Sequence, residues 1–255
     1  MKYSKITLVF ALAIIWFFTV DLSAFMIGEK LTFDIKYGII GAGRASLTIT
    51  ESVHQDTIPV YEIRSEARTN SFFDRFFKVR DEIVSVWDQE KLVTRKFHKR
   101  LREGGYRQNR IHFYYPEQNL TVYMRYSYSD EEWREDVMDI PDNTQDMLSA
   151  FYLVRQKELT PGESVYVQAT ADGRSTEVEV KVHRIEEIDT IFGEKECVVI
   201  EPILENESIF KHTAEIYIWV TNDEYKIPIK LESKVIFGHF RAILSDAQNV
   251  PYSKK

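Results

Sequence analysis

The sequence predicts an all-β protein with one helix, arranged as an antiparallel, open or half-closed β-barrel of about a dozen strands around that single central helix. Apolar and polar residues alternate along most of the chain, and turn-forming residues interrupt the alternation repeatedly. One segment near the midpoint instead has apolar residues at helical spacing. Because a long antiparallel sheet must protect its edges, curling around a helix is an economical arrangement for these elements.

The first predicted strand shows the alternation most clearly. In LTFDIKY, residues 31–37, four apolar side chains share one face and three polar side chains share the other. One apolar face and one charged face are typical of an antiparallel sheet with one side in water. The same pattern recurs at residues 45–53, 79–87, 176–182, 214–220 and 227–235.

Turn-forming residues separate the predicted strands. Glycines punctuate the first hairpin at positions 38, 41 and 43, and Gly104-Gly105 divides a basic stretch into two strands. Further turns are predicted at residues 116–119, 172–173 and 222–223.

The segment DNTQDMLSAFYLVRQKEL, residues 142–159, predicts one helix of about twelve residues. Asn143 or Thr144 is expected to cap its start, and Pro161-Gly162 stops the chain from continuing as a helix. The side chains expected on its buried face are Met147, Leu148, Phe151 and Tyr152. No low-complexity segment adjoins it, so residues 25–255 are expected to form a single β-rich domain.

The N-terminal residues 1–24 have the features of an export signal. Lys2 and Lys5 precede an apolar run, and Ala24 supplies a small residue at which a peptidase could cut. The run is shorter than the ~20 residues of a typical membrane span, although an uncleaved N-terminal anchor is the alternative. After removal of the signal no transmembrane span is expected. We therefore expect a periplasmic or otherwise exported cell-envelope location in a Gram-negative type of bacterium.

Cysteine content and charge exclude several classes of protein. Cys197 is the only cysteine, so an intramolecular disulfide and a cysteine-based zinc cluster are impossible. It lies in the apolar run ECVVIEP, where a free cysteine is usually a small buried hydrophobe. The net charge of −7 and the expected export argue against nucleic acid as a partner.

Five phrases in order resemble the bacterial family called domain of unknown function 3108. They are GEKLTFDIKYGIIGAGRASL near the start, FFDRFFKVRDE, EGGYRQ, DMLSAFYLVR and IWVTNDEYKIPIKLESKVIFGHFRAIL. The resemblance runs from about Gly28 to Leu244, whereas residues 112–140 do not match the family pattern. It implies an exported, mostly β envelope protein, and it assigns no catalytic residues.

The sequence gives little support to an enzyme. Its six histidines never occur at metal-ligand spacing, and no GxSxG motif is present. No carboxylate pair is distinguished for acid–base chemistry, so neither a catalytic residue, a metal nor a cofactor is expected. Should polar groups nevertheless converge in a cavity, Arg155, Asp81 and Glu103 would be the residues to test.

Four phenylalanines in SFFDRFFKV form the most unusual apolar stretch. Phe72, Phe73, Phe76 and Phe77 could belong to the core, or they could form a mobile aromatic lip over an apolar cavity. Asp74-Arg75 between them indicates a turn in water, which keeps the lip hypothesis open.

Residues 95–110, RKFHKRLREGGYRQNR, concentrate seven cations against one acid. Their alternation places Lys96, His98, Arg100 and Arg102 on one face of the first strand, and Arg107 follows the turn. These side chains could form a solvated rim neutralised by the acidic run DEEWRED, residues 130–136. Alternatively they could form a cationic mouth for an anionic lipid or another envelope polyanion.

Two charged residues mark the predicted helix. Asp146 in its first turn and Arg155 in its last would each complement the helix dipole. Nine residues apart, they lie on opposite sides of a helix and cannot pair. An inward-facing Arg155 that meets a ligand carboxylate or phosphate is the alternative.

These observations lead to one functional hypothesis and one alternative. The first is a non-enzymatic envelope protein that binds an apolar or amphiphilic, lipid-like ligand in the barrel concavity, with the phenylalanines lining it and the basic hairpin meeting the polar end. The alternative is a structural or assembly module that acts through contacts with an envelope protein partner.

Overall fold

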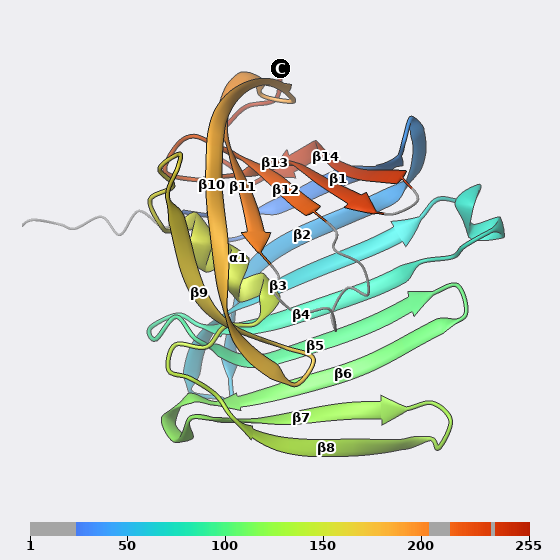
Figure 1. Ribbon diagram of the computed structural model, residues 1–255, viewed down its shortest axis with the longest axis vertical. Helices are drawn as coiled ribbons and strands as arrows, with labels where there is room; N and C mark the ends of the chain where they lie inside the picture. Colours follow the sequence, from blue (N-terminus) through green and yellow to red (C-terminus); the bar gives the residue numbers. More distant parts are fainter. Residues whose placement is uncertain (1–23, 204–214, 236–237) are drawn as a thin grey trace, which may run out of the picture.

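The computed structural model describes residues 24–203, 215–235 and 238–255, and within them fourteen strands form one sheet. All pairings between neighbouring strands are antiparallel, in the order β8-β7-β6-β5-β4-β3-β2-β1-β14-β13-β12-β11-β10-β9 (Figure 1). The strands of the first half are β1 (Lys30–Tyr37), β2 (Ile40–His54), β3 (Ile58–Thr69), β4 (Arg80–Asp88), β5 (Thr94–Glu103), β6 (Tyr106–Tyr115), β7 (Leu120–Ser127) and β8 (Glu132–Asp139). Those of the second half are β9 (Ser164–Ala171), β10 (Arg174–Thr190), β11 (Gly193–Ile203), β12 (Glu215–Thr221), β13 (Pro228–Val235) and β14 (Gly238–Gln248).

The sheet is curved but it does not close into a barrel. β8 and β9 stand at its two edges, and no ladder joins them in the described part of the chain. The prediction of an all-β fold with an open antiparallel sheet is thus confirmed, with fourteen strands where about a dozen were expected. β1 pairs with β14, so the first and last strands lie side by side near the centre of the sheet.

The helix α1 covers Met147–Arg155 and is shorter than the sequence suggests. Asp146, and not Asn143 or Thr144, caps its start: the Asp146 carboxylate accepts hydrogen bonds from the backbone N–H groups of Leu148 and Ser149. The Ser149 hydroxyl in turn accepts from the Asp146 N–H, which completes a capping box. The expected buried face is wrong at Met147, which is exposed at the first turn.

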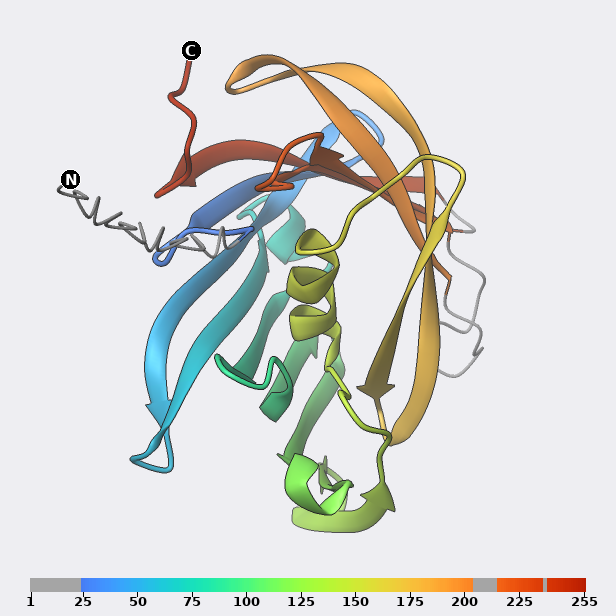
Figure 2. The same cartoon turned by 90° about the vertical axis from the view of Figure 1, so that its left-hand side faces the viewer.

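Both halves of the sheet pack against α1, which lies between them (Figure 2). Val154 belongs to an apolar cluster with residues of β9 to β12, including Val167 and Val220. Tyr152 belongs to a second cluster with Phe25 and with Trp87 of β4. The side of the sheet that faces α1 is called the inner face below, and the opposite side the outer face.

A third cluster joins β1 and β14 to β11, β12 and β13, and it contains Cys197. The cysteine is fully buried, as predicted for a small hydrophobe, and burial raises the pKa of its thiol to about 12. Helices long and apolar enough to cross a membrane are absent from the residues described. Two 3₁₀ turns complete the fold, η1 (Phe73–Arg75) and η2 (Pro116–Gln118).

Candidate functional site

The basic stretch forms β5 and β6, and its alternation divides the cations of β5 between the two faces. Phe97 packs in an apolar cluster with Tyr114 and Ile140, so its neighbours Arg95 and Lys99 share the inner face and are buried. The candidate residues Lys96, His98, Arg100 and Arg102 therefore lie on the outer face, away from α1. The predicted grouping is confirmed, but this group faces water and not the concavity.

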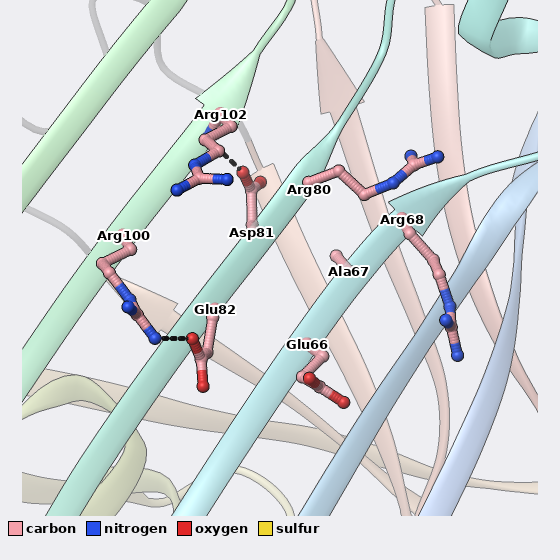
Figure 3. Close-up of a pocket in the computed structure, with 8 residues that line it drawn as sticks. All are labelled: Glu66, Ala67, Arg68, Arg80, Asp81, Glu82, Arg100 and Arg102. Atoms are coloured by element: carbon pink, nitrogen blue, oxygen red, sulfur yellow. Dashed lines mark hydrogen bonds and ion pairs between the residues drawn. The ribbon is translucent and has the colours of Figure 1, made fainter.

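The outer face of β3, β4 and β5 carries a groove of about 330 Å³, called the outer groove here (Figure 3). It is lined by Glu66, Ala67, Arg68, Arg80, Asp81, Glu82, Arg100 and Arg102. A second groove of about 230 Å³ shares Glu82 and Arg100 with it and continues towards Lys96 and His98. The two grooves together form a charged track along β4 and β5.

Acids of β4 and of the β3–β4 connection neutralise part of this track. Glu82 pairs with both Arg64 and Arg100. The Arg80 guanidinium lies 2.6 Å from the carboxylate of Asp74. The side chains of Arg68 and Arg102 make no ion pair with any residue in the described part of the chain, which leaves two guanidinium groups of the outer groove for an anion.

The acidic run 130–136 does not neutralise the basic hairpin, contrary to expectation. Asp130 pairs with Arg134 of the same segment, and Asp136 pairs with Arg125 of β7 at 2.6 Å. Register explains the difference, because β4 lies beside β5 and places Glu82 directly opposite Arg100.

The four phenylalanines lie in the connection between β3 and β4, residues 70–79, called the aromatic loop below. Phe72, Phe76 and Phe77 are exposed, Phe76 to 75%, so the hypothesis of a core position is wrong for these three. Phe73 is half-buried. The loop is fastened at its start, because the Asn70 carboxamide oxygen accepts hydrogen bonds from the N–H groups of Phe72 and Phe73.

The aromatic loop touches the turn between β5 and β6. The Gly104 N–H donates to the Lys78 carbonyl at 2.8 Å, and Val79 bridges to Glu103. The Phe77 ring covers Gly104 so closely that a Cβ there would come within 2.8 Å of the ring, and Gly104 has a φ of +54°. Glycine is therefore required at this contact, both for its φ and for its missing side chain.

Arg107 follows that turn and supports it. Its guanidinium donates to the carbonyls of Gly104 and Tyr106, both at 2.8 Å. The structure thus brings Phe77 and Arg107 to one turn, with Arg102 on the strand that leads into it. Phe77 and Arg107 therefore both contact Gly104, and the aromatic lip over an apolar cavity stays a prediction.

Arg155 lies elsewhere, fully buried on the inner side. Its guanidinium donates to the carboxylate of Glu29 at 2.7 and 2.8 Å and to the carbonyls of Ala24 and Tyr225. Glu29 is equally buried. Neither Asp81 nor Glu103 is among the partners of Arg155, so these three polar residues do not converge.

Sequence reasoning missed Glu29, because 126 residues separate it from Arg155. It also missed a polar cluster on the inner face of β6 and β7. There the ring of His112 stacks on Tyr123 with 4.2 Å between centroids, and its Nε2 has no hydrogen-bond partner in the described part of the chain. Burial lowers the pKa of His112 to about 4 and raises that of Tyr123 to about 12.

Asp172, in the turn between β9 and β10, reaches this inner cluster. It binds Lys99 at 2.8 Å and Arg110 at 2.7 Å, which ties the turn to β5 and β6. Burial acts to raise the pKa of Asp172, but the charges of Lys99 and Arg110 outweigh it and lower the pKa. In the described residues, no group of three or more His, Cys, Asp or Glu side chains could hold a metal ion.

Fold and surface together define a class: an antiparallel, β-barrel-like protein with one helix and a charged outer groove. A β-barrel-like protein of domain of unknown function DUF1849 from Brucella abortus has the same fold, with a TM-score of 0.57 and 12% identity. The similarity covers 89% of this chain and 99% of that one. A protein with a YmcC-like fold from Bacteroides fragilis is similar at a TM-score of 0.35 and 10% identity, over 88% of this chain and 97% of that one.

The family can be named from the sequence. The profile of the family described as protein of unknown function (DUF3108) matches residues 32–245, and the chain belongs to this family. The resemblance inferred from the five sequence phrases is therefore confirmed. No curated protein is significantly similar in sequence to this chain.

Proposed function

We propose that this protein is a non-enzymatic cell-envelope protein that binds an anionic amphiphile on the outer face of its sheet. Such a molecule has a phosphate or carboxylate head and an apolar tail. The export-signal features of residues 1–24 support a periplasmic location. Binding in the concavity has less support, because α1 and two apolar clusters occupy the space between the halves of the sheet.

The single observation that carries the proposal is the contact between the aromatic loop and the outer groove. Asp74 of the loop binds Arg80 of the groove, and Phe77 lies on the turn that follows Arg102. Exposed aromatic rings and unpaired guanidinium groups therefore share one end of the sheet. Neither feature alone would indicate a ligand with both a charged and an apolar part.

The chemistry of each side chain determines which part of the ligand it would bind. Arg68 and Arg102 would bind the anionic head, because a guanidinium matches the geometry of phosphate and carboxylate oxygens. The tail would lie across Phe72 and Phe76, whose rings are exposed to water. Removing this apolar surface from water would stabilise the complex. No bond is made or broken in this function.

The test is a titration with dihexanoylphosphatidylglycerol below its micelle-forming concentration, followed by native mass spectrometry of protein purified without detergent. We expect a 1:1 adduct that the double variant R68Q/R102Q weakens about tenfold or more, since charge-assisted hydrogen bonds are lost. The matched control R125Q/R134Q removes two cations of β7 and β8 and should bind as the wild type. An unliganded wild type, or an equal loss in the control, contradicts the proposal.

A second candidate function, a structural or assembly module, is favoured by one observation. The β9 edge has the sequence SVYVQATA without a charge and exposes Tyr166, whereas the β8 edge, EWREDVMD, is heavily charged. Charged edges discourage pairing with another strand, and the backbone of Gln145 already bonds to Gln168 and Thr170, so the first half of β9 is the edge that a partner strand would extend. Crosslinking in the envelope that is abolished by Y166P, which removes an outward-facing N–H of β9, but not by V137P, which removes one of β8, would identify this function.

A further inference from the structure

Three hairpin ends form one connected surface, which we call the hairpin rim: residues 37–41, 70–79 and 102–107. Because neighbouring strands are antiparallel, the β1–β2, β3–β4 and β5–β6 connections all emerge at the same end of the sheet (Figure 1). The Asn70 side chain donates to the Gly41 carbonyl at 2.7 Å, which joins the first connection to the aromatic loop. Gly104 joins the aromatic loop to the third through its hydrogen bond to Lys78.

Every one of these three ends exposes large apolar side chains. Ile39 is 93% exposed and Ile40 51%, in a turn of sequence YGIIG that carries no charge. The aromatic loop exposes Phe72, Phe76 and Phe77, and the third end exposes Tyr106. At the spacing of ~4.8 Å between strands, the apolar tips extend over roughly 20 Å.

The charge of the hairpin rim has one predominant sign. Its cations are Arg75, Lys78, Arg102 and Arg107; behind them, the outer groove holds both signs of charge and is not counted in this balance. Of its two acids, Asp74 is neutralised by Arg80, and Glu103 is half-buried with a pKa raised by burial and by the charge of Asp81. The hairpin rim is therefore positive and apolar, although the chain as a whole has a net charge of −7.

We propose that the hairpin rim docks on the surface of a membrane that contains anionic lipids. This inference rests on the function proposed above, and it names the membrane as the source of the amphiphile. The isoleucine and phenylalanine side chains would leave water for the interfacial region, where the amphipathic ring of Tyr106 is also favoured, while the cations meet lipid phosphates. The apolar side chains project from separate turns, whose backbone polar groups remain in contact with headgroups and water. A protein partner would have to match those turn backbones individually, so a membrane fits this surface better.

The connection between β7 and β8, at the same end of the sheet, indicates how the protein would be oriented on the membrane. The turn between β7 and β8 and the start of β8 carry Asp130, Glu131 and Glu132 against one cation, Arg134, so this connection has a net negative charge that an anionic membrane repels. The protein would thus tilt, with the β1–β6 end of the sheet against the lipid and the β7–β8 turn away from it.

The experiment compares sedimentation with vesicles of phosphatidylcholine alone and of phosphatidylcholine mixed with phosphatidylglycerol. We expect partitioning at least about tenfold stronger onto the anionic vesicles, decreasing as salt shortens the Debye length from ~10 Å at 0.1 M to ~3 Å at 1 M. The variant I39S/I40S should lose about tenfold or more, because two exposed isoleucines no longer enter the interface. The matched control V53S/I185S replaces two exposed apolar residues outside the hairpin rim and should partition as the wild type.

The two proposals fail in different ways. Neither Ile39 nor Ile40 lines the grooves, so I39S/I40S should still bind monomeric dihexanoylphosphatidylglycerol as the wild type does. Monomer binding without vesicle binding, or unchanged vesicle binding by I39S/I40S, overturns membrane docking and leaves the outer groove as an amphiphile site. Vesicle binding without monomer binding overturns the proposed function and reduces the hairpin rim to a peripheral membrane contact.

Discussion

The two faces of β5 carry similar numbers of cations but place them in opposite environments. On the inner face, Arg95 lies 2.7 Å from the carboxylate of Asp88, and Lys99 lies 2.8 Å from that of Asp172, both shielded from water. On the outer face, Arg100 and Arg102 are exposed; within the described residues the guanidinium of Arg100 pairs with Glu82, whereas Arg102 meets an acid, Asp81, only through its backbone N–H. Buried cations therefore serve the fold, whereas exposed cations are available to bind something else.

The free-energy cost of losing an ion pair differs between the two faces. Removing one member of a buried ion pair leaves an uncompensated charge in a poorly solvated place, at a cost of several kcal/mol. An exposed pair contributes only ~0–1 kcal/mol, because water and salt screen it. Substitutions on the inner face should therefore change stability, and those on the outer face should change binding.

The largest effect is expected at Glu29 and Arg155, whose exposed fractions are both 1%. R155M or E29Q alone should lower the free energy of unfolding by about 3–5 kcal/mol, since each leaves a buried charge without its counter-charge. The double variant E29Q/R155M should be more stable than R155M. Urea denaturation measures all three, and a double variant that loses the sum of both single effects would contradict the pair as the cause.

The second effect is a pH dependence that originates at His112. The pKa of His112 is about 4 in the folded chain and ~6.5 when unfolded, so between these values only the unfolded chain binds the proton. Stability should fall as the pH falls from 6.5 to 4, by at most about 3 kcal/mol from this residue. Urea denaturation across this range should show a shallower slope for H112F.

The control for His112 is H239Q, because His239 is exposed in β14. It tests whether loss of any histidine has the same consequence. If H112F keeps the full pH dependence of the wild type, burial of His112 is not the cause of that dependence.

A smaller effect is expected at Asp172, which compensates the charges of both Lys99 and Arg110. Asp172 has a φ of +48°, a conformation that asparagine adopts readily, so D172N removes charge with little backbone strain. We expect a loss of about 2 kcal/mol by urea denaturation, because the three side chains are only partly exposed. D136N removes the acid of the exposed pair with Arg125 and should cost about 0.5 kcal/mol or less; equal losses would erase the distinction between the faces.

The smallest change in stability is expected on the outer face. R100Q breaks the pair with Glu82, which Arg64 continues to neutralise, so the free energy of unfolding should change by less than about 1 kcal/mol. Affinity for dihexanoylphosphatidylglycerol should fall in the same variant, because a cation of the outer groove is lost. A variant that unfolds more easily but binds normally would show that Arg100 serves the fold.

Local patterns in the sequence determined the class of fold and the kinds of elements. The period of two in LTFDIKY and the other strands, the glycines of the turns and the helical spacing of DMLSAFYLVR each depend on neighbouring residues alone. The alternation also grouped Lys96, His98, Arg100 and Arg102 correctly on one face. The helix start was misplaced, because the capping box of Asp146 and Ser149 was overlooked in favour of Asn143 and Thr144.

Tertiary structure alone decided which face is buried and which charges meet. Both faces of β5 carry cations, so alternation could not say which set would be covered, and the pairing with β4 then brought Glu82 to Arg100. Glu29 and Arg155 meet because the chain places β1 and the end of α1 together, across a separation that no local pattern spans. The sequence also left open whether the four phenylalanines are buried, because an apolar side chain is buried only where another element covers it. Among the described residues no element covers Phe76.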